Sequence, residues 1–186
     1  NGSTDGTWAL AERLAADPRV TAVAQRPNQG KAAALNAGIA ASDTDIVVMV
    51  DADTVLARDA VRRLVAPLLH DGRLGGVAGN VKVGNRTGLV PLLQSVEYVT
   101  GLNLGRRAQH LLGAITTVPG AAAAFRRRAL EDAGGVPGDT RIEDTDLTIA
   151  VQRSGWGVVY APSALAYTEV PGTWRGLVAQ RTRWIG

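Results

Sequence analysis

Two aspartates, Asp51 and Asp53, stand one residue apart directly after the apolar run at residues 46–50. Carboxylates at this spacing on a bending chain can both reach one hard cation, and Mg²⁺ or Mn²⁺ would link such oxygen ligands to a diphosphate. The simpler interpretation is a strand that ends in polar turn residues. Because the motif is short, the pair alone leaves both interpretations open.

A lysine, Lys31, closes the segment Asn-Gln-Gly-Lys at residues 28–31, just before a helical pattern of apolar residues. Backbone N–H groups at the start of a helix, together with a lysine, favour the binding of an anion. The alternative is an ordinary capped helix whose lysine is solvated. The segment is not a P-loop, because the glycine spacing of that motif and its Ser or Thr are missing.

A second acidic pair, Glu143 and Asp144, follows a loop rich in glycine and proline and precedes a helical pattern that starts near Leu147. Acidic residues commonly stabilise the start of a helix, and Asp146 fits that plain capping role. The functional interpretation is a general base that takes a proton from an attacking hydroxyl. The spacing alone does not decide between the two.

The segment Gln-Arg-Thr-Arg-Trp at residues 180–184 combines hydrogen-bond donors, two guanidinium groups and an indole. Arginine binds diphosphate through its forked geometry, and an aromatic face suits a sugar ring. The alternative is a basic amphipathic helix that lies on a membrane surface. Both interpretations can hold at once.

The elements that must position these residues alternate between helix and strand in the first half of the chain, which predicts a layered α/β domain. The continuous apolar run at 46–50 is typical of a strand buried on both faces of a parallel sheet. Helical patterns are expected at residues 8–15, 32–39, 61–69, 90–112, 147–152 and 174–185, and strands at 20–24, 75–83, 158–160 and 164–168.

The composition fits one folded domain over residues 1–186, because 46% of the residues are hydrophobic. The net charge is +3, but the basic residues form no single stripe and aromatic residues are only 4%, so no nucleic-acid partner is expected. The absence of cysteine excludes disulfides and thiolate metal sites. No apolar run approaches the roughly 20 residues that span a bilayer.

Taken together and in this order, the motifs resemble the processive branch of glycosyltransferase family 2, which has the GT-A fold. The turn at residues 1–6 looks like the end of that family's first acidic loop, and Gly30-Lys31 with Leu35-Asn36 looks like its second donor-binding segment. Asp51-Ala52-Asp53 matches its D-x-D motif, Glu143-Asp144 its T-E-D motif and residues 180–184 its Q-x-x-R-W motif. Further segments, among them residues 80–86 and 168–171, are most similar to the poly-β-1,6-N-acetylglucosamine synthase subgroup.

The resemblance implies a GT-A domain, Rossmann-like and layered α/β/α, with a mixed, mainly parallel sheet. It implies a single inverting displacement at the anomeric carbon of the sugar, with the metal and Arg183 stabilising the leaving diphosphate. The implied roles are as follows: Asp144 is the catalytic base; Asp53 and Asp51 hold Mg²⁺ or Mn²⁺; Lys31, Asp51, Asp53, Gln180, Arg183 and Trp184 bind the donor; Gly120, Glu143 and Trp184 lie on the acceptor side.

The implied partners are a UDP-sugar donor, with N-acetylglucosamine as the sugar by similarity to the subgroup, and a growing β-linked polysaccharide acceptor. The parent protein is expected to carry flanking transmembrane helices. With the amphipathic segment at 174–185, these would hold the domain at the cytoplasmic face of the bacterial cell membrane.

The sequence departs from the family pattern in two ways. The family's first strand, with the Asp that contacts uracil, would precede Asn1, so we expect the sequence to be truncated at both ends. Ile142 stands where the family usually has threonine. That position orients neighbouring groups and does not react, so we expect a small effect.

Two alternatives come from other functional classes. Asp51-Ala52-Asp53-Thr54 also fits the nucleophile motif of a phosphatase of the haloacid dehalogenase kind. That interpretation lacks the required downstream lysine and paired acidic motif, and it leaves residues 180–184 unexplained. The other alternative is a non-catalytic GT-A-like domain that only binds a ligand. All the polar groups expected within the segment are present, which argues against this alternative.

Overall fold

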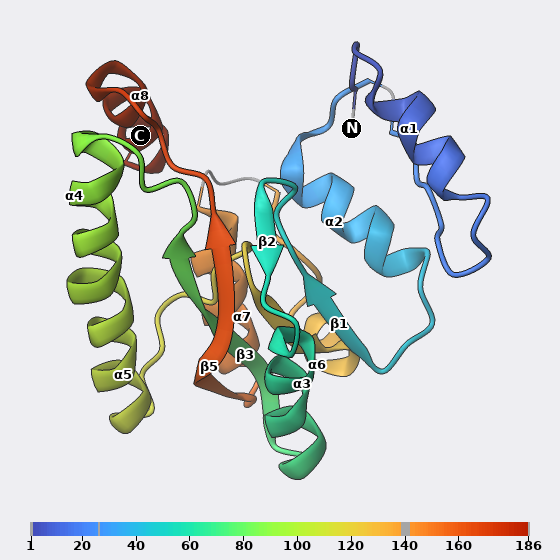
Figure 1. Ribbon diagram of the computed structural model, residues 1–186. Coiled ribbons are helices and arrows are strands. Elements are labelled where there is room, and N and C mark those ends of the chain that lie inside the picture. Colours follow the sequence, from blue (N-terminus) through green and yellow to red (C-terminus); the bar gives the residue numbers. More distant parts are fainter. Residues whose placement is uncertain (1, 26, 139–141, 186) are drawn as a thin grey trace.

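The computed structural model describes residues 2–25, 27–138 and 142–185, with the side chains of residues 184 and 185 left out. In this part of the chain a five-stranded sheet has the order β1-β4-β3-β5-β2, and helices cover both of its faces (Figure 1). The layered α/β fold expected from the sequence is confirmed. The strands are β1 (Ile46–Met49), β2 (Thr54–Leu56), β3 (Leu74–Val83), β4 (Ala123–Arg126) and β5 (Gly157–Thr168).

The sheet is mixed, as expected, but it is not mainly parallel. Among the described strands only β3 and β5 pair in parallel, whereas β1 with β4, β3 with β4, and β2 with β5 pair antiparallel. The reason is that β4 is inserted between β1 and β3 in the opposite direction. The strands β1, β3 and β5 therefore still point the same way, and their carboxyl ends share one edge of the sheet.

Two expectations about individual strands are wrong. β1 is an edge strand with half-buried Ile46, Val47 and Val48, and not a strand buried on both faces of a parallel sheet. Residues 20–24 form no strand, and Val20 and Val23 are 41% and 42% exposed. A β-branched run forms a strand only where a partner strand can pair with it, and none of the described strands does so here.

The helical expectations are confirmed. A single helical column, which we call the helical wall, covers residues 89–111 and contains α4, the π-helix η1 and α5. The expected strands at 158–160 and 164–168 join into the single strand β5. The helices are α1 (Thr7–Leu14), α2 (Gly30–Ala40), α3 (Ala60–His70), α4 (Leu89–Glu97), η1 (Tyr98–Asn103), α5 (Leu104–Leu111), α6 (Arg127–Asp132), α7 (Glu143–Arg153) and α8 (Trp174–Ile185).

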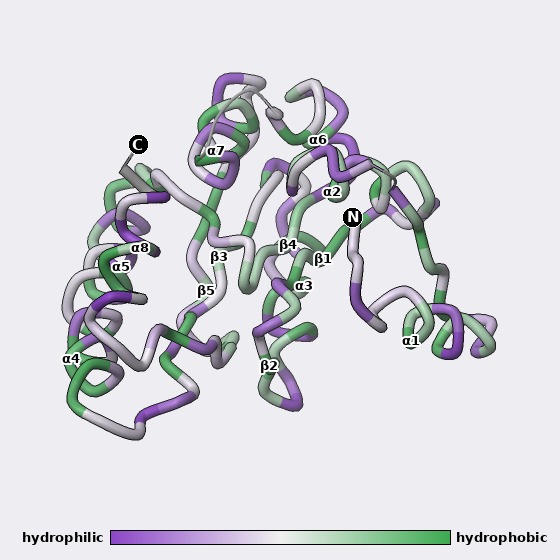
Figure 2. Tube along the Cα trace, turned by 90° about the horizontal axis from the view of Figure 1, so that it is seen from above, coloured by the Kyte–Doolittle hydropathy of each residue, from purple (hydrophilic) through white to green (hydrophobic). Residues whose placement is uncertain are grey.

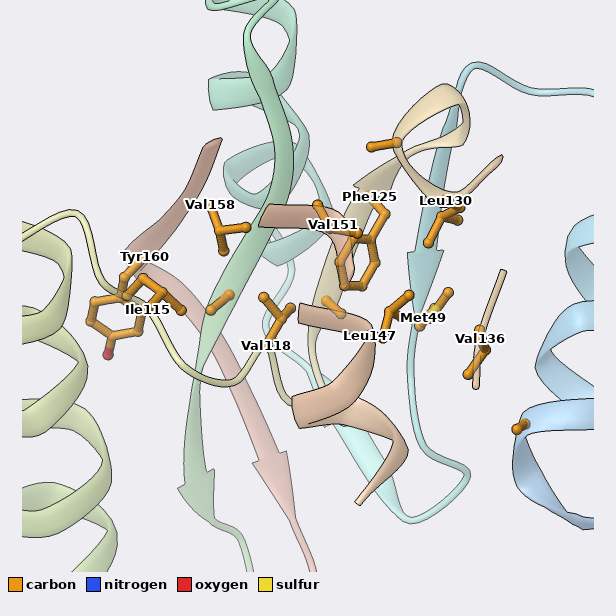
Figure 3. Packing of buried hydrophobic residues seen from close by; sticks show 14 residues of the cluster. Met49, Ile115, Val118, Phe125, Leu130, Val136, Leu147, Val151, Val158 and Tyr160 are labelled. Atoms are coloured by element: carbon orange, nitrogen blue, oxygen red, sulfur yellow. The ribbon is translucent and has the colours of Figure 1, made fainter. Parts of the chain in front are cut away.

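The hydrophobic core lies on both faces of the sheet. On one face, Leu64 and Leu68 of α3 pack with Val77 of β3. On the other face, Leu147 and Val151 of α7 join a cluster that also contains Phe125, Leu130 and Met49 (Figure 3). Because α7 is anchored through these side chains, its first turn is held at the edge of the sheet where β1 ends.

A third buried cluster attaches the helical wall to the sheet. Tyr98 of η1 packs with Val81 and Val83 of β3 and with Ala166 of β5. The wall therefore packs against the carboxyl-terminal halves of β3 and β5. The view from above shows the wall on the side of the sheet where these two strands lie (Figure 2). In the described ranges, every helix is too short or too polar to traverse a lipid bilayer.

Candidate active site

A cleft of about 480 Å³ opens at the edge where β1, β3 and β5 end. Ligands of open α/β sheets collect at this edge, so its position agrees with the position expected for the acidic pair after β1. The predicted site residues that line this one cleft are Lys31, Asp51, Asp53, Gly120, Glu143, Asp144 and Gln180. Segments more than 100 residues apart in the sequence thus meet at one site.

Lys31 is placed by the start of α2. The N–H of Gly30 donates to the Asn28 side-chain oxygen at 2.9 Å, and Gly30 has φ +88°, which favours glycine. Farther along α2, Asn36 makes two hydrogen bonds of 2.9 Å to the backbone of Val136, one donated and one accepted. These bonds fix α2, and with it Lys31, relative to the segment that leads toward α7.

Asp144 is placed by four hydrogen bonds between α7 and the loop before β4. The loop N–H of Gly120 donates to Asp144 Oδ2 at 2.8 Å, and the N–H of Val118 donates to the Thr148 hydroxyl at 2.8 Å. The hydroxyls of Thr117 and Thr145 lie 2.8 Å apart, and Gln152 donates to the carbonyl of Ile115 at 2.8 Å. The acceptor-side loop predicted around Gly120 is therefore held directly against Asp144.

Lys31 lies at the centre of a group that we call the carboxylate network, formed by Lys31, Asp51, Glu143 and Asp144. Its Nζ is 3.1 Å from Asp51 Oδ1, 3.3 Å from Glu143 Oε1 and 3.8 Å from Asp144 Oδ1. A Cβ added to Gly120 would lie 2.8 Å from this Nζ and 3.1 Å from both Asp144 carboxylate oxygens. A larger residue at this position would force the Lys31 ammonium or the Asp144 carboxylate to shift.

The network shifts the pKa values of its members. Burial raises the pKa of Asp144, and the nearby Glu143 and Asp51 carboxylates add to this, although Lys31 and the Gly120 N–H pull the pKa down. For Lys31, burial lowers the pKa, but the Asp144, Asp51 and Glu143 carboxylates outweigh burial, so the net pKa is raised. Lys31 is therefore a fixed cation, and Asp144 is more basic than an ordinary aspartate.

Asp51 and Asp53 suit a divalent metal by their chemistry, since both carboxylates face the same cleft. Among the described residues, Asp53 Oδ1 makes only long contacts of 3.4 Å, with the hydroxyls of Thr54 and Thr168, so these residues engage its carboxylate weakly. The described residues contain no group of three or more His, Cys, Asp or Glu arranged to hold a metal.

The predicted Q-x-x-R-W residues are only partly brought to the cleft. Gln180 lines it, whereas Arg183 is exposed and is not among the residues that line it. The side chain of Trp184 lies outside the described part of the chain. Between them, Arg181 of α8 forms an ion pair of 2.6 Å with Glu97 of α4, which ties α8 to the helical wall.

Sequence reasoning missed the residues that the helical wall contributes to the cleft. Tyr98, Leu102 and Arg106 line it, and Arg106 is only 9% exposed. Their spacing of four residues within a helical segment was the available signal, since it places them along one face. Arginine on a helix is usually solvated, so the sequence alone gave no reason to single out Arg106.

The whole chain, residues 1–186, matches the family model described as "Glycosyltransferase like family 2". The chain belongs to this family. This match removes the phosphatase alternative. The expected family, the GT-A-type fold and the enzyme class, glycosyltransferase, are confirmed.

Curated relatives include the poly-β-1,6-N-acetyl-D-glucosamine synthases of Staphylococcus aureus (strain COL) and Staphylococcus epidermidis. Each is 33% identical over 184 residues, which cover 99% of this chain and 45% of the relative. The glycosyltransferase domain thus spans less than half the length of these relatives.

Among solved structures, a mannosyltransferase from Pyrobaculum calidifontis in complex with GDP-Man and Mn²⁺ has a TM-score of 0.78 and 30% identity, covering 98% of this chain and 49% of that one. Glucosyl-3-phosphoglycerate synthase from Mycobacterium tuberculosis, with Mn²⁺ and UDP-glucose, has a TM-score of 0.57 and 24% identity, covering 99% of this chain and 63% of that one. The second likeness supports the fold alone.

Proposed function

We propose that this glycosyltransferase transfers N-acetylglucosamine from a UDP-sugar to a growing β-linked polysaccharide, by one inverting displacement that depends on a divalent metal. The observation that carries the proposal is the convergence of Asp53, Asp144 and Lys31 on one cleft at the carboxyl edge of the sheet. The names of the staphylococcal relatives support the sugar and the polymer.

Asp144 is the catalytic base in this proposal. Its carboxylate accepts the proton of the acceptor hydroxyl while the hydroxyl oxygen attacks the anomeric carbon and the bond to the diphosphate breaks. Burial raises the pKa of Asp144, which makes it a stronger base than a solvated aspartate. The Gly120 N–H, bonded to Oδ2 at 2.8 Å, holds the carboxylate in one orientation.

The donor diphosphate lies on the Lys31 side of the cleft in this proposal. Asp53 and Asp51 hold Mg²⁺ or Mn²⁺, which when bound stabilises the negative charge of the leaving diphosphate. Lys31 adds a fixed positive charge beside Asp51, and Gln180 lines the same cleft. Arg183 and Trp184 stay predictions for donor binding, and Trp184, Gly120 and Glu143 for the acceptor side.

We also propose that the domain works at the cytoplasmic face of the bacterial cell membrane as part of a longer protein with transmembrane helices. Exposed apolar side chains on two neighbouring helices support this placement: Leu92, Leu93 and Val96 on α4, and Trp174 and Val178 on α8. Amphipathic helices with basic residues bind membrane surfaces through such faces.

The decisive experiment is incubation of the full-length membrane protein with labelled UDP-sugars and Mn²⁺. We expect UDP release and a labelled polymer with UDP-N-acetylglucosamine, and β-configured linkages by NMR. A polymer built from another sugar would correct the donor. Absence of UDP release with every donor would contradict the proposed use of a UDP-sugar.

A further inference from the structure

Arg106 is a buried cation that the proposed chemistry does not yet use. Its side chain is 9% exposed, and it lies on α5 in the wall of the cleft. Burial lowers the pKa of its guanidinium. Charged side chains are almost never buried unless an opposite charge or a set of hydrogen bonds compensates them, so the burial of Arg106 needs an explanation.

The described residues compensate the charge of Arg106 only in part. Arg106 forms no ion pair with the described residues, and its Nη1 is buried without a hydrogen-bond partner among them. The hydroxyl of nearby Tyr160 contacts Asn103 Oδ1 at 3.3 Å instead. The other groups close enough to act on Arg106 electrostatically are Tyr98 and Asp144.

The backbone is shaped to present Arg106 and its neighbours to the cleft. The helical wall widens into the π-helix Tyr98–Asn103, and such segments are frequent at functional sites. Tyr98, Leu102 and Arg106 follow one another along the face of the wall that lines the cleft, beside Val81 of β3. This corner therefore combines an aromatic ring, apolar side chains and a guanidinium whose Nη1 has no partner among the described residues.

The charge of the cleft indicates what this corner binds. Five carboxylates line the cleft against the two cations Lys31 and Arg106, so an additional anion at the Arg106 end would meet repulsion from Asp144. A neutral pyranose fits better, because its C–H faces suit the ring and apolar side chains, and its hydroxyl or amide carbonyl oxygens accept hydrogen bonds from a guanidinium. The carboxylates are Asp51, Asp53, Glu143, Asp144 and Glu169.

We propose that Arg106, with Tyr98 and Leu102, forms an acceptor-side subsite that binds a neutral pyranose of the growing chain, with the Arg106 guanidinium donating to an oxygen of that sugar. The inference rests on the proposed function, because it places the subsite beside Asp144, the base that activates the acceptor hydroxyl. The subsite would hold the acceptor sugar on the side of Asp144 that faces the helical wall, opposite Lys31.

The test uses the full-length enzyme with saturating UDP-N-acetylglucosamine and Mn²⁺, and a β-1,6-linked N-acetylglucosamine trisaccharide as the acceptor probe. For Arg106→Gln we expect the acceptor KM to rise on the order of 10-fold or more, since a charged hydrogen bond is lost. Arg106→Lys keeps the positive charge but lacks the forked geometry of the guanidinium, so its acceptor KM should lie between those of the wild type and Arg106→Gln. Arg107→Gln removes the same charge from the exposed neighbour and should keep the acceptor KM within about twofold of the wild type.

Two further measurements separate binding from a structural role. The Kd for UDP by calorimetry should be the same in Arg106→Gln as in the wild type, and the thermal unfolding midpoint should not fall, because the variant removes an uncompensated buried charge. An unchanged acceptor KM would overturn the subsite, as would weakened UDP binding or loss of folding in both Arg106 variants. If the wild type itself transfers no sugar, the proposed function fails and the subsite fails with it; a working wild type matched by Arg106→Gln refutes the subsite alone.

Discussion

The two walls of the cleft surround their cations in opposite ways: Lys31 is 41% exposed and paired, whereas Arg106 is buried and is not paired with any described residue. On the side of α2 and α7, Lys31 is surrounded by the carboxylates of Asp51, Glu143 and Asp144 within 3.1–3.8 Å. On the helical wall, Arg106 has no such partner among the described residues. The first wall is organised before any ligand binds, whereas the second contains a guanidinium whose Nη1 has no hydrogen-bond partner among the described residues.

This difference suggests that the wall formed by α2 and α7 carries out the chemistry and that the helical wall binds the acceptor. A preorganised ionic group costs no rearrangement at the moment of reaction, which suits a base and a metal site. An unpaired donor gains its hydrogen bond only when a ligand arrives, which suits recognition. Variants of the carboxylate network should therefore lower kcat or metal-linked donor binding, and variants of the helical wall should raise the acceptor KM.

The largest effect is expected from Asp144→Asn, which removes the proposed base and keeps its shape. We expect kcat to fall on the order of 10³-fold, because a positioned base contributes about 10²- to 10⁴-fold. UDP binding measured by calorimetry should stay nearly unchanged. Asp43→Asn, at an exposed position, is the matched control and should keep full activity. Turnover near the wild-type level in Asp144→Asn would remove Asp144 from the base role.

The next effect is expected from Asp53→Ala, which removes one of the two proposed metal ligands. Metal-linked affinity for UDP should fall on the order of 10²-fold, because a bound cation contributes several kcal/mol of charge stabilisation. Calorimetry with and without Mn²⁺ measures this directly. If wild-type UDP binding does not respond to Mn²⁺, the metal role of the acidic pair is wrong.

The layered α/β fold and the course of most helices could be predicted from sequence, because apolar periodicity is local. The order and direction in which the strands pair could not be predicted from the sequence. The antiparallel insertion of β4 between β1 and β3 joins residues about 80 positions apart, as in the register of Ile46 with Arg126. For the same reason the apolar run at 46–50 indicated a fully buried strand, although β1 lies at the edge of the sheet.

The candidate site shows the same limit. The carboxylate network could be predicted because each member belongs to a short motif with recognisable chemistry. Arg106 could not, because it is buried by the packing of the helical wall against the sheet, where Tyr98 contacts Val81 and Tyr160 of β5 lies near the guanidinium. The four-residue spacing of Tyr98, Leu102 and Arg106 places them on one helix face, but it does not show that contacts distant in sequence bury the arginine.

A smaller effect is expected from Gly120→Ala, which leaves every charged group in place and alters only their spacing. The added Cβ would meet Lys31 Nζ at 2.8 Å and the Asp144 oxygens at 3.1 Å, so the network must shift. We expect kcat to fall about 10-fold, since small misplacements of reacting groups are costly. Gly38→Ala, within α2 and with open space around it, is the control and should keep kcat while stabilising the fold by about 0.4–1 kcal/mol. Equal kcat in the two variants would show that the space left by Gly120 is not needed to position Lys31 and Asp144.

The smallest effect at neutral pH, and the most specific, is expected from Lys31→Gln assayed at saturating donor. Lys31 lowers the pKa of Asp144, so its removal should raise that pKa further. A base acts only when it is deprotonated, and the acidic limb of the kcat–pH profile should therefore move to higher pH. Lys82→Gln removes the same charge outside the cleft and should leave the limb in place. A limb that stays fixed in Lys31→Gln, or that moves to lower pH, would show that the carboxylate network does not set the basicity of Asp144.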